Sequence, residues 1–452
     1  MAGERTTMPP RTSRIRAGIR REVAWVRERT STGIWAIVDQ GLFSGSNFIV
    51  WVLLARWMSP SEYGALVTSY AVFLGLAVIH TGMLAEPMVV FGSGRHAAGF
   101  GTYIRVLLRE HLRLTAAAAA ILVAAGGGIV ALHGERLGLA VAGIGLASPC
   151  ILLVWLARRA CYVHANPRRA AVTSGAYLAA VAASLALLNR MSALSISAVQ
   201  LSLAGAAIVA AAPVLWRMWT DSETFVPRSA AAQIRADHWR YGRWSTSTGL
   251  LQWIELQVWY LVLSGTQGLA ASAELRAIMN LILPILQVDV ALMGVLVPAL
   301  VRARPDPSRF RHIIMVALAV FVTEAAVYSG AIAIFGPTVL KIAIAGRYTI
   351  DARVVRLLAV IPVWNSLSNV LGSSAIALEQ PRRVFRATAA GAAVAALVGT
   401  WATANWGVAG AVIGMLGAFV IQALVLSVSF TKFRNAAAPF QTLDRAAIGV
   451  ID

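Results

Sequence analysis

Residues 33–57 read GIWAIVDQGLFSGSNFIVWVLLARW. Only two of these side chains, Asp39 and Arg56, carry a charge, and nearly all the others are apolar or small. A helix of this length and composition meets the requirement of roughly 20 apolar residues for crossing about 30 Å of hydrocarbon. The stretch therefore predicts a membrane-spanning helix with a carboxylate inside it and an arginine near its end.

Eleven further stretches of this kind follow. The chain of 452 residues is 58% hydrophobic and 13% charged, whereas a soluble domain has about 25% charged residues. The twelve expected spans are residues 33–57, 63–87, 113–132, 138–158, 170–189, 195–216, 244–265, 274–300, 313–335, 354–379, 385–403 and 406–431. We therefore expect an all-α polytopic membrane protein. The net charge of +19 is better explained by basic loops at a membrane than by nucleic acid.

The basic residues alternate across these spans. Lys and Arg collect in cytoplasmic loops, because they resist translocation and meet anionic lipid. Basic residues at the ends of spans are counted with the adjoining loop, which places Arg113, Arg158 and Arg386 on the inner side and Arg356 on the outer side. With a cytoplasmic amino terminus, 31 of the 39 basic residues then fall on the inner side, six on the outer side, and two, Arg56 and Arg276, inside spans. Both termini are therefore expected in the cytoplasm.

An internal repeat divides the chain. The loop Asn166-Pro167-Arg168-Arg169 after the fourth span returns after the tenth as Gln380-Pro381-Arg382-Arg383. Six spans per half give both halves the same orientation, which indicates a parallel repeat. We expect a basic, amphipathic cytoplasmic segment at 1–32, a six-helix bundle at 33–216, a cytoplasmic linker at 217–243, a second six-helix bundle at 244–431 and a cytoplasmic tail at 432–452.

Several polar residues fall inside the spans. Charges at membrane depth are costly and are functional candidates by default. Counting about 1.5 Å per residue places Asp39 and His80 at a similar depth in the first half, where they could meet. Glu255, Asp289 and Glu324 fall near mid-depth in the second half. These four carboxylates are candidates for coupling to H⁺ or Na⁺, and the alternative is that each bonds a neighbouring helix.

Two asparagines accompany the carboxylates of the second half. Asn365 and Asn369 are spaced i, i+4, so they share one face of the tenth span at a similar depth.

Short motifs in spans 1, 2 and 8 carry a family resemblance. They are Asp39-Gln40-Gly41, Ser44-Gly45-Ser46-Asn47, Leu54-Ala55-Arg56, Ser59-Pro60-Ser61-Glu62-Tyr63-Gly64, Leu275-Arg276-Ala277-Ile278-Met279-Asn280-Leu281 and the loop at 380–383. In these residues the chain resembles the polysaccharide transporter (oligosaccharide flippase) branch of the multidrug/oligosaccharidyl-lipid/polysaccharide (MOP) superfamily, related to MATE exporters and lipid II flippases. The likeness spans nearly the whole chain, and its specific motifs lie in the first hundred residues.

The resemblance implies a fold and a function. The fold is a V-shaped pair of six-helix bundles, related by a parallel pseudo-two-fold, around a cavity that opens alternately to each side. The function is export of a polyprenyl-pyrophosphate-linked oligosaccharide, such as an O-antigen, capsule or exopolysaccharide repeat unit, across a bacterial inner membrane. The partners are the lipid-linked oligosaccharide, membrane lipid, and a polysaccharide polymerase and chain-length regulator. No cofactor and no nucleic acid are expected.

Arginine binds phosphate through a planar fork of donors, which makes it the natural partner of a pyrophosphate head. The candidate substrate-binding residues are Arg56, Arg276, Asn47, Asn280, Arg168 and Arg382. The competing interpretation is that Arg56 and Arg276 reach to the outer interface, and that the loop arginines only set topology.

Three other functions remain open. A flippase for the peptidoglycan precursor is one, although relatives of that kind usually have two further spans. A MATE-type multidrug or cation antiporter would use acidic and aromatic residues in its cavity. A membrane polysaccharide polymerase or ligase would need a large outer loop, but the longest outer connection here, roughly 336–353, is short. The sequence contains no phosphate-binding loop and no nucleophile–base motif, so we expect a transporter rather than an enzyme.

Overall fold

The computed structural model describes residues 11–97, 99–220, 227–348 and 350–435, which form helices and no strands. The first lobe consists of α1 (Arg11–Trp57), α2 (Pro60–His80), a π-helical turn (Thr81–Ala85), α3 (Glu86–Gly92), α4 (Phe100–His133), α5 (Glu135–Val163), α6 (Pro167–Arg190) and α7 (Ile196–Thr220). A long helix, α8 (Arg228–Thr266), leads to the second lobe. That lobe consists of α9 (Leu269–Met279), α10 (Leu283–Ala303), α11 (Pro307–Ala343), α12 (Ala352–Leu358), α13 (Ile361–Ala377), α14 (Pro381–Val394), a second π-helical turn (Ala395–Gly399) and α15 (Thr400–Asn435).

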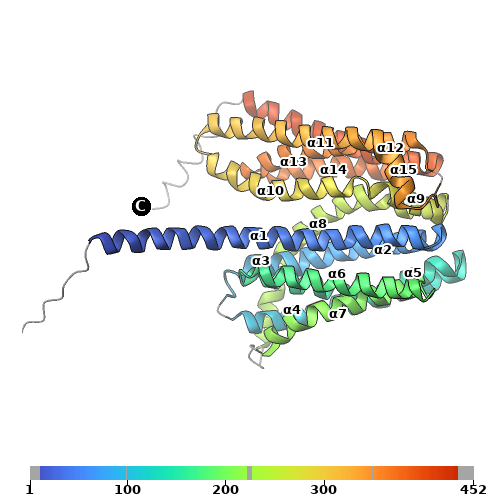
Figure 1. The fold of residues 1–452 in the computed structure, drawn as a ribbon, viewed down its shortest axis with the longest axis horizontal. Coiled ribbons are helices and arrows are strands. Elements are labelled where there is room, and N and C mark those ends of the chain that lie inside the picture. Colours follow the sequence, from blue (N-terminus) through green and yellow to red (C-terminus); the bar gives the residue numbers. More distant parts are fainter. Residues whose placement is uncertain (1–10, 98, 221–226, 349, 436–452) are drawn as a thin grey trace, which may run out of the picture.

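Figure 1 shows the two lobes as two groups of roughly parallel helices, with α8 passing between them. One end of the bundle carries the loops around Arg95, Asn166, Asp306 and Gln380, and we call it the basic end. The opposite end carries the turns around Ser59 and Gly268, and we call it the far end.

Local sequence explains where the helices begin. Ser59 caps α2 by accepting a bond from the Glu62 backbone, the Glu62 carboxylate accepts from the Ser59 backbone, and Pro60 occupies the first turn. Asp306 caps α11 by accepting bonds from the backbone amides of Ser308 and Arg309, and Pro307 follows it. The helix breaks therefore follow from capping residues at the loops that hydropathy predicts.

Ten helical stretches among the described residues are long and apolar enough to cross a membrane. The predicted span 244–265 lies in α8, which Gln252, Glu255 and Gln257 make too polar to qualify. The predicted spans 385–403 and 406–431 are counted together as Pro381–Val428, within which the chain turns at Gly407 with φ 57°. The chain is thus a multi-pass helical membrane protein.

Three expected boundaries differ from the structure. Residues 15–29 of the basic amino-terminal segment were expected to form a short amphipathic helix of their own on the inner membrane surface, but the helix that begins at Arg11 runs without a break into the first span. The third span was expected to begin at residue 113, but α4 begins at Phe100 and includes Arg105 and Arg109. The expected linker is helical from Arg228 onward. In the second and third cases, basic residues that were placed in a loop extend a helix, because arginine is a good helix former. Residues 1–10 and 436–452 of the expected terminal segments lie outside the described part.

The two lobes meet closely at the far end. A Cβ built on Gly64 of α2 would lie 1.8 Å from the carbonyl oxygen of Leu269, so only glycine permits this approach. The hydroxyls of Thr68 and Ser264 are 2.5 Å apart. Arg347 donates to the Met58 carbonyl oxygen at 3.0 Å. These contacts close the far end between the lobes.

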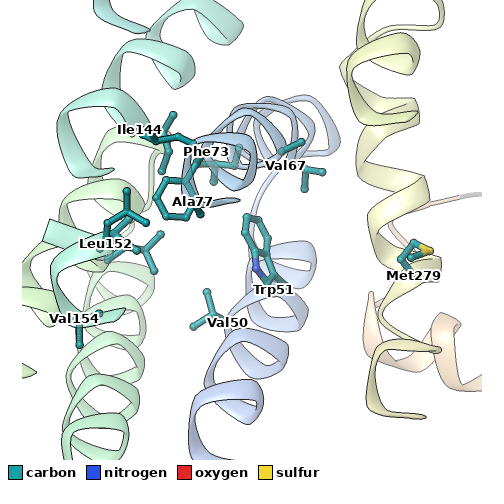
Figure 2. Packing of buried hydrophobic residues seen from close by; sticks show 14 of the residues in the cluster. Val50, Trp51, Val67, Phe73, Ala77, Ile144, Leu152, Val154 and Met279 are labelled. Carbon is teal, nitrogen blue, oxygen red and sulfur yellow. The ribbon is translucent and has the colours of Figure 1, made fainter. Parts of the chain in front are cut away.

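The core of the first lobe reaches this junction. Trp51 of α1 packs edge-on against Tyr63 and Tyr70 of α2, with ring centroids 6.0 and 4.7 Å apart. Figure 2 shows Trp51 between a group of packed residues around Phe73 and Leu152 on one side and the helix that bears Met279 on the other. Trp51 therefore lies where the first lobe faces α9.

Candidate functional site

Three adjoining cavities lie along α8. The first two lie between α8 and the first lobe, and the third lies between the two lobes. The mouth cavity, about 820 Å³, is at the basic end and is lined by Arg95, Arg240 and Trp244 among others. The middle cavity, about 340 Å³, shares Ser245, Gly249 and Gln252 with it. The Arg276 cavity, about 580 Å³, shares Leu74, Trp155 and Gln257 with the middle cavity. Together they form a path from the basic end toward the closed far end.

The Arg276 cavity has a distinct chemistry. Its lining combines the amides of Gln40, Asn47, Gln257 and Gln287 with aromatic rings, including Trp51, Tyr70 and Trp155. Arg276 is the one charged residue among its lining residues, and no Asp or Glu of the described chain lines it. The cavity therefore suits a ligand with an anionic group and many hydrogen-bonding groups.

Arg276 is positioned by α9 and held by an aromatic ring. The residue is 9% exposed, and its guanidinium carbon lies 4.8 Å from the centroid of the Trp51 ring. Its Nε has no hydrogen-bond partner in the described part of the chain. A buried guanidinium without a carboxylate is costly, so it is poised to gain from an incoming anion.

The two predicted substrate-binding asparagines, Asn47 and Asn280, lie near Arg276 at different positions relative to the cavity. Asn47 lines the Arg276 cavity, and its Nδ2 donates to the Phe43 carbonyl oxygen at 3.2 Å. Asn280 follows Arg276 by one turn and is buried, and its Oδ1 is without a partner among the described residues. The structure thus brings Asn47 and Arg276 to one cavity and places Asn280 behind it.

The other three predicted arginines lie elsewhere, and none of them lines the three cavities. Arg56 is exposed at the far end of α1, where reaching to the interface accounts for it. Arg168 and Arg382 are exposed in the first turns of α6 and α14 at the basic end, and Arg168 lies 5.6 Å from the Trp35 ring.

Asp289 and the two asparagines of α13 form a polar cluster inside the second lobe. Asp289 Oδ2 accepts bonds from Asn365, Ser366 and Asn369 at 2.9, 2.8 and 3.2 Å. The expectation that the two asparagines share a face is confirmed. Asp289 is 1% exposed and its Oδ1 has no partner among the described residues. The site therefore offers a free carboxylate oxygen beside amide groups.

The two remaining predicted carboxylates, Glu324 and Glu255, lie in different environments. Glu324 on α11 is near enough to Asp289 for their charges to interact. Glu255 is buried on another face of α8, against Gly391 of α14, and its Oε1 is unpartnered within the described chain. The structure thus groups Glu324 with Asp289 and separates Glu255 from them.

Asp39 has a different environment from the one expected. Its carboxylate accepts bonds from Arg158 Nη2 at 2.8 Å and Nε at 3.1 Å, from Tyr162 at 2.7 Å and from Ser174 at 2.5 Å. Arg158 also lies over the Phe43 ring, 3.6 Å from its centroid. The placement of Arg158 in an inner loop was wrong, because this buried carboxylate stabilises it inside α5. The network occupies both oxygens of Asp39.

His80 does not meet Asp39, which corrects the other expectation for this depth. Its Nε2 lies 2.9 Å from Nδ1 of His111 on α4, and both side chains are buried. The shared depth of Asp39 and His80 did not bring them together, because they lie on faces that turn toward different helices.

The part of α8 nearest the basic end is held against the first lobe by an ion pair and hydrogen bonds. Asp237 pairs with Arg95 at 2.7 Å. His238 lies 2.6 Å from the Tyr103 hydroxyl through Nε2 and 2.8 Å from the Met83 carbonyl oxygen through Nδ1. Burial lowers the pKa of His238, opposed by the hydrogen bond to Met83. Sequence analysis missed this contact, because pairing partners so far apart leave no local pattern.

Comparison with known proteins finds similarity in structure alone. No protein-family profile matches the chain, and no curated protein sequence matches it. An inward-facing multidrug resistance MATE family transporter of the MOP superfamily superposes with a TM-score of 0.67, at 15% identity over 89% of this chain and 100% of that one. The outward-facing conformation of such a transporter gives a TM-score of 0.64, at 14% identity over 92% and 96%.

A third similar structure carries a description of its own. It is a MOP superfamily transporter from Pyrococcus furiosus, reported with the statement that the reverse polarity of its binding pocket suggests a different function. Its TM-score is 0.63, at 14% identity over 91% of this chain and 95% of that one. These likenesses show that the chain has the fold of the MATE and MOP superfamily transporters.

Proposed function

We propose that the chain is a transporter that moves a polyprenyl-pyrophosphate-linked oligosaccharide from the cytoplasmic to the outer leaflet by alternating access. The observation that carries the proposal is the position of Arg276, the one charged residue in a lobe-to-lobe cavity lined otherwise by amides, aromatic rings and apolar or small side chains. A pyrophosphate would receive charge-assisted hydrogen bonds from the guanidinium, and sugar hydroxyls would pair with the amides.

The same cavity argues against a cationic cargo. An organic cation would gain from carboxylates and would be repelled by Arg276. Two carboxylates line the path before the Arg276 cavity. Asp237 lies at the mouth and is already paired with Arg95, and Glu86 lines the mouth and middle cavities and accepts a hydrogen bond from Ser245. A multidrug exporter is nevertheless the second candidate, since similar structures are described as MATE transporters.

The arrangement of the cavities supports a cycle. The path is closed at the far end by Gly64 and Leu269 and is open at the basic end. Because basic loops favour the cytoplasm, this state is inward-facing. The lipid tail would stay in the bilayer, since moving it into a polar cavity would forfeit about 0.8 kcal/mol per CH₂. Rocking of the lobes would then open the far end.

Asp289 with Asn365 and Asn369 is the best-supported coupling site for Na⁺ or H⁺. It has a buried carboxylate oxygen without a partner, and Glu324 adds negative charge nearby. Oxygen ligands of this kind suit a hard cation.

Deletion of the gene in its host tests the function. Lipid-linked sugars would be analysed on each face of inner-membrane vesicles. We expect a completed lipid-linked oligosaccharide to accumulate on the cytoplasmic face, and the wild-type gene to clear it. The variant Arg276→Ala should not clear it. No accumulation together with sensitivity to cationic drugs would contradict the proposal and favour the exporter.

A further inference from the structure

Polar residues of α8 line the path along its length. The residues Tyr241, Ser245, Thr248 and Gln252 recur at intervals of three or four, so they share one side of the helix. Gln257 follows Gln252 by five residues and points to another side, but it lines the middle cavity together with Gln252 and also lines the Arg276 cavity. The helix rises about 1.5 Å per residue, so the stretch from Tyr241 to Gln257 is about 24 Å long. We call these five residues the α8 track.

The amides of the track are free to bind. Gln252 is exposed and Gln257 is half-buried, and neither has a hydrogen-bond partner within the described residues. A free amide in a cavity between membrane helices offers two donors and an acceptor to a ligand.

Aromatic rings face the same path. Trp155 lines both the middle cavity and the Arg276 cavity. The Trp253 ring is fixed by a bond from its Nε1 to the Ala71 carbonyl oxygen at 2.8 Å. Trp244 and Tyr241 line the mouth cavity. Aromatic rings beside amides and hydroxyls, with Trp155 of α5 facing them from the first lobe, suit pyranose sugars, which present apolar faces and polar edges.

We propose that the α8 track binds the sugar chain of the cargo while Arg276 holds its anionic head. The cargo is then a glycan of several sugars, because one or two rings would fill only the part of the track next to Arg276. This inference rests on the proposed function, because a pyrophosphate head bound at Arg276 determines at which end of the track the glycan begins.

Binding to purified protein tests the track. The probes are three lipids from the host, which are the full lipid-linked glycan, the same lipid carrying only its first sugar, and the polyprenyl diphosphate without sugar. Tryptophan fluorescence reports binding, because Trp155, Trp244 and Trp253 line the path. The test variant is Gln252→Leu/Gln257→Leu, which removes both amides and keeps similar volume. The control is Ser247→Ala, an exposed α8 residue that lines none of the three cavities.

We expect the wild-type protein to bind the full glycan at least about tenfold tighter than the one-sugar lipid. The double variant should lose about tenfold for the full glycan and change little for the one-sugar lipid, and Ser247→Ala should bind like the wild type. Equal wild-type affinity for the full glycan and the one-sugar lipid would overturn the track, as would an equal loss for both in the double variant.

Failure of the proposed function has a different signature. If Arg276→Gln binds all three lipids as tightly as the wild type, the head-group assignment falls. A preference for the full glycan that depends on Gln252 and Gln257 would still support the track in that case. If none of the three lipids binds, both proposals fall.

Discussion

The guanidinium carbon of Arg276, in the second lobe, lies 4.8 Å from the centroid of the Trp51 ring, in the first lobe. Such a contact contributes about 0.5–2 kcal/mol, and more as it is removed from water. It exists because the far end is closed, since Gly64 and Leu269 bring α2 against the start of α9. The anion-binding group is therefore coupled to the conformation, because opening the far end would remove the ring from Arg276.

The far-end closure depends on a glycine. Gly64→Ala would place a Cβ 1.8 Å from the Leu269 carbonyl oxygen, and the backbone there cannot yield as a flexible side chain would. We expect the lobes to move apart at this end. Spin labels at Arg190 and Arg356 would show a longer distance between the lobes than in the wild type.

The control for the closure is Gly265→Ala, where a Cβ meets nothing within 4 Å. This variant should keep the wild-type distance. An unchanged distance in Gly64→Ala would contradict the assignment of this contact to the closure.

Asp289 should carry the response to Na⁺. A site that binds Na⁺ only in the folded state stabilises by about 2.7 kcal/mol at a hundredfold excess over its dissociation constant. We expect the melting temperature of the wild type to rise with Na⁺ over K⁺ at equal ionic strength. Asp289→Asn should abolish the rise, because it neutralises the carboxylate. Glu379→Gln, an exposed change at the basic end, should retain it. A full Na⁺ response in Asp289→Asn would contradict this site.

Asp39 and Arg158 should behave as a structural pair. Removing one partner of a buried ion pair costs about 3–5 kcal/mol, because the other charge is left uncompensated. Asp39→Asn and Arg158→Met should each lower the free energy of unfolding by about this much. The double variant should recover most of the loss, as a double-mutant cycle would show. Additive losses would show that the two side chains do not stabilise each other.

The fastening of α8 at His238 should weaken in acid. Burial lowers the pKa of His238 in the folded protein, whereas the unfolded value is about 6.5. A depressed histidine pKa means that the neutral form stabilises the fold, and this stability is lost as pH falls below about 6.5. The protection factors for hydrogen exchange in residues 228–243, which are corrected for the slower intrinsic exchange in acid, should therefore fall as pH falls.

The variant His238→Gln should remove most of this pH dependence. His312→Gln, a change at an exposed histidine of α11, should leave it intact. The groups around His238 that also carry charge are Asp237, His96 and Glu110. If the protection factors in residues 228–243 stay equally high in acid, His238 does not control the contact.

The sequence predicted the spans well and the polar contacts unevenly, for a physical reason. Hydrophobic thickness acts on each segment separately, so spans can be identified one at a time. The i, i+4 spacing of Asn365 and Asn369 is equally local, and both donate to Asp289. Arg158 was misplaced because its partner, Asp39, is far away in the chain, and a charge count does not detect a buried pair.

The cavity itself was predicted only in part. Arg276 and Asn47 were expected at the site and line one cavity. Gln252, Gln257 and Trp155 were not singled out as site residues. The available signal was the run of polar residues that makes α8 too polar to count as a span. Which side of α8 faces the path depends on packing between lobes, and this is not encoded in a single segment.

Reconstitution tests the central claim most directly. The purified protein would be placed in liposomes that contain the host's lipid-linked glycan, and movement of the glycan between leaflets would be followed with a membrane-impermeant sugar-modifying reagent. The account predicts that wild-type protein exposes the glycan on both faces and that Arg276→Gln slows this at least about tenfold, the loss of a charge-assisted bond. Wild-type protein that leaves the glycan on its original face, or Arg276→Gln that moves it as fast as the wild type, would contradict the account.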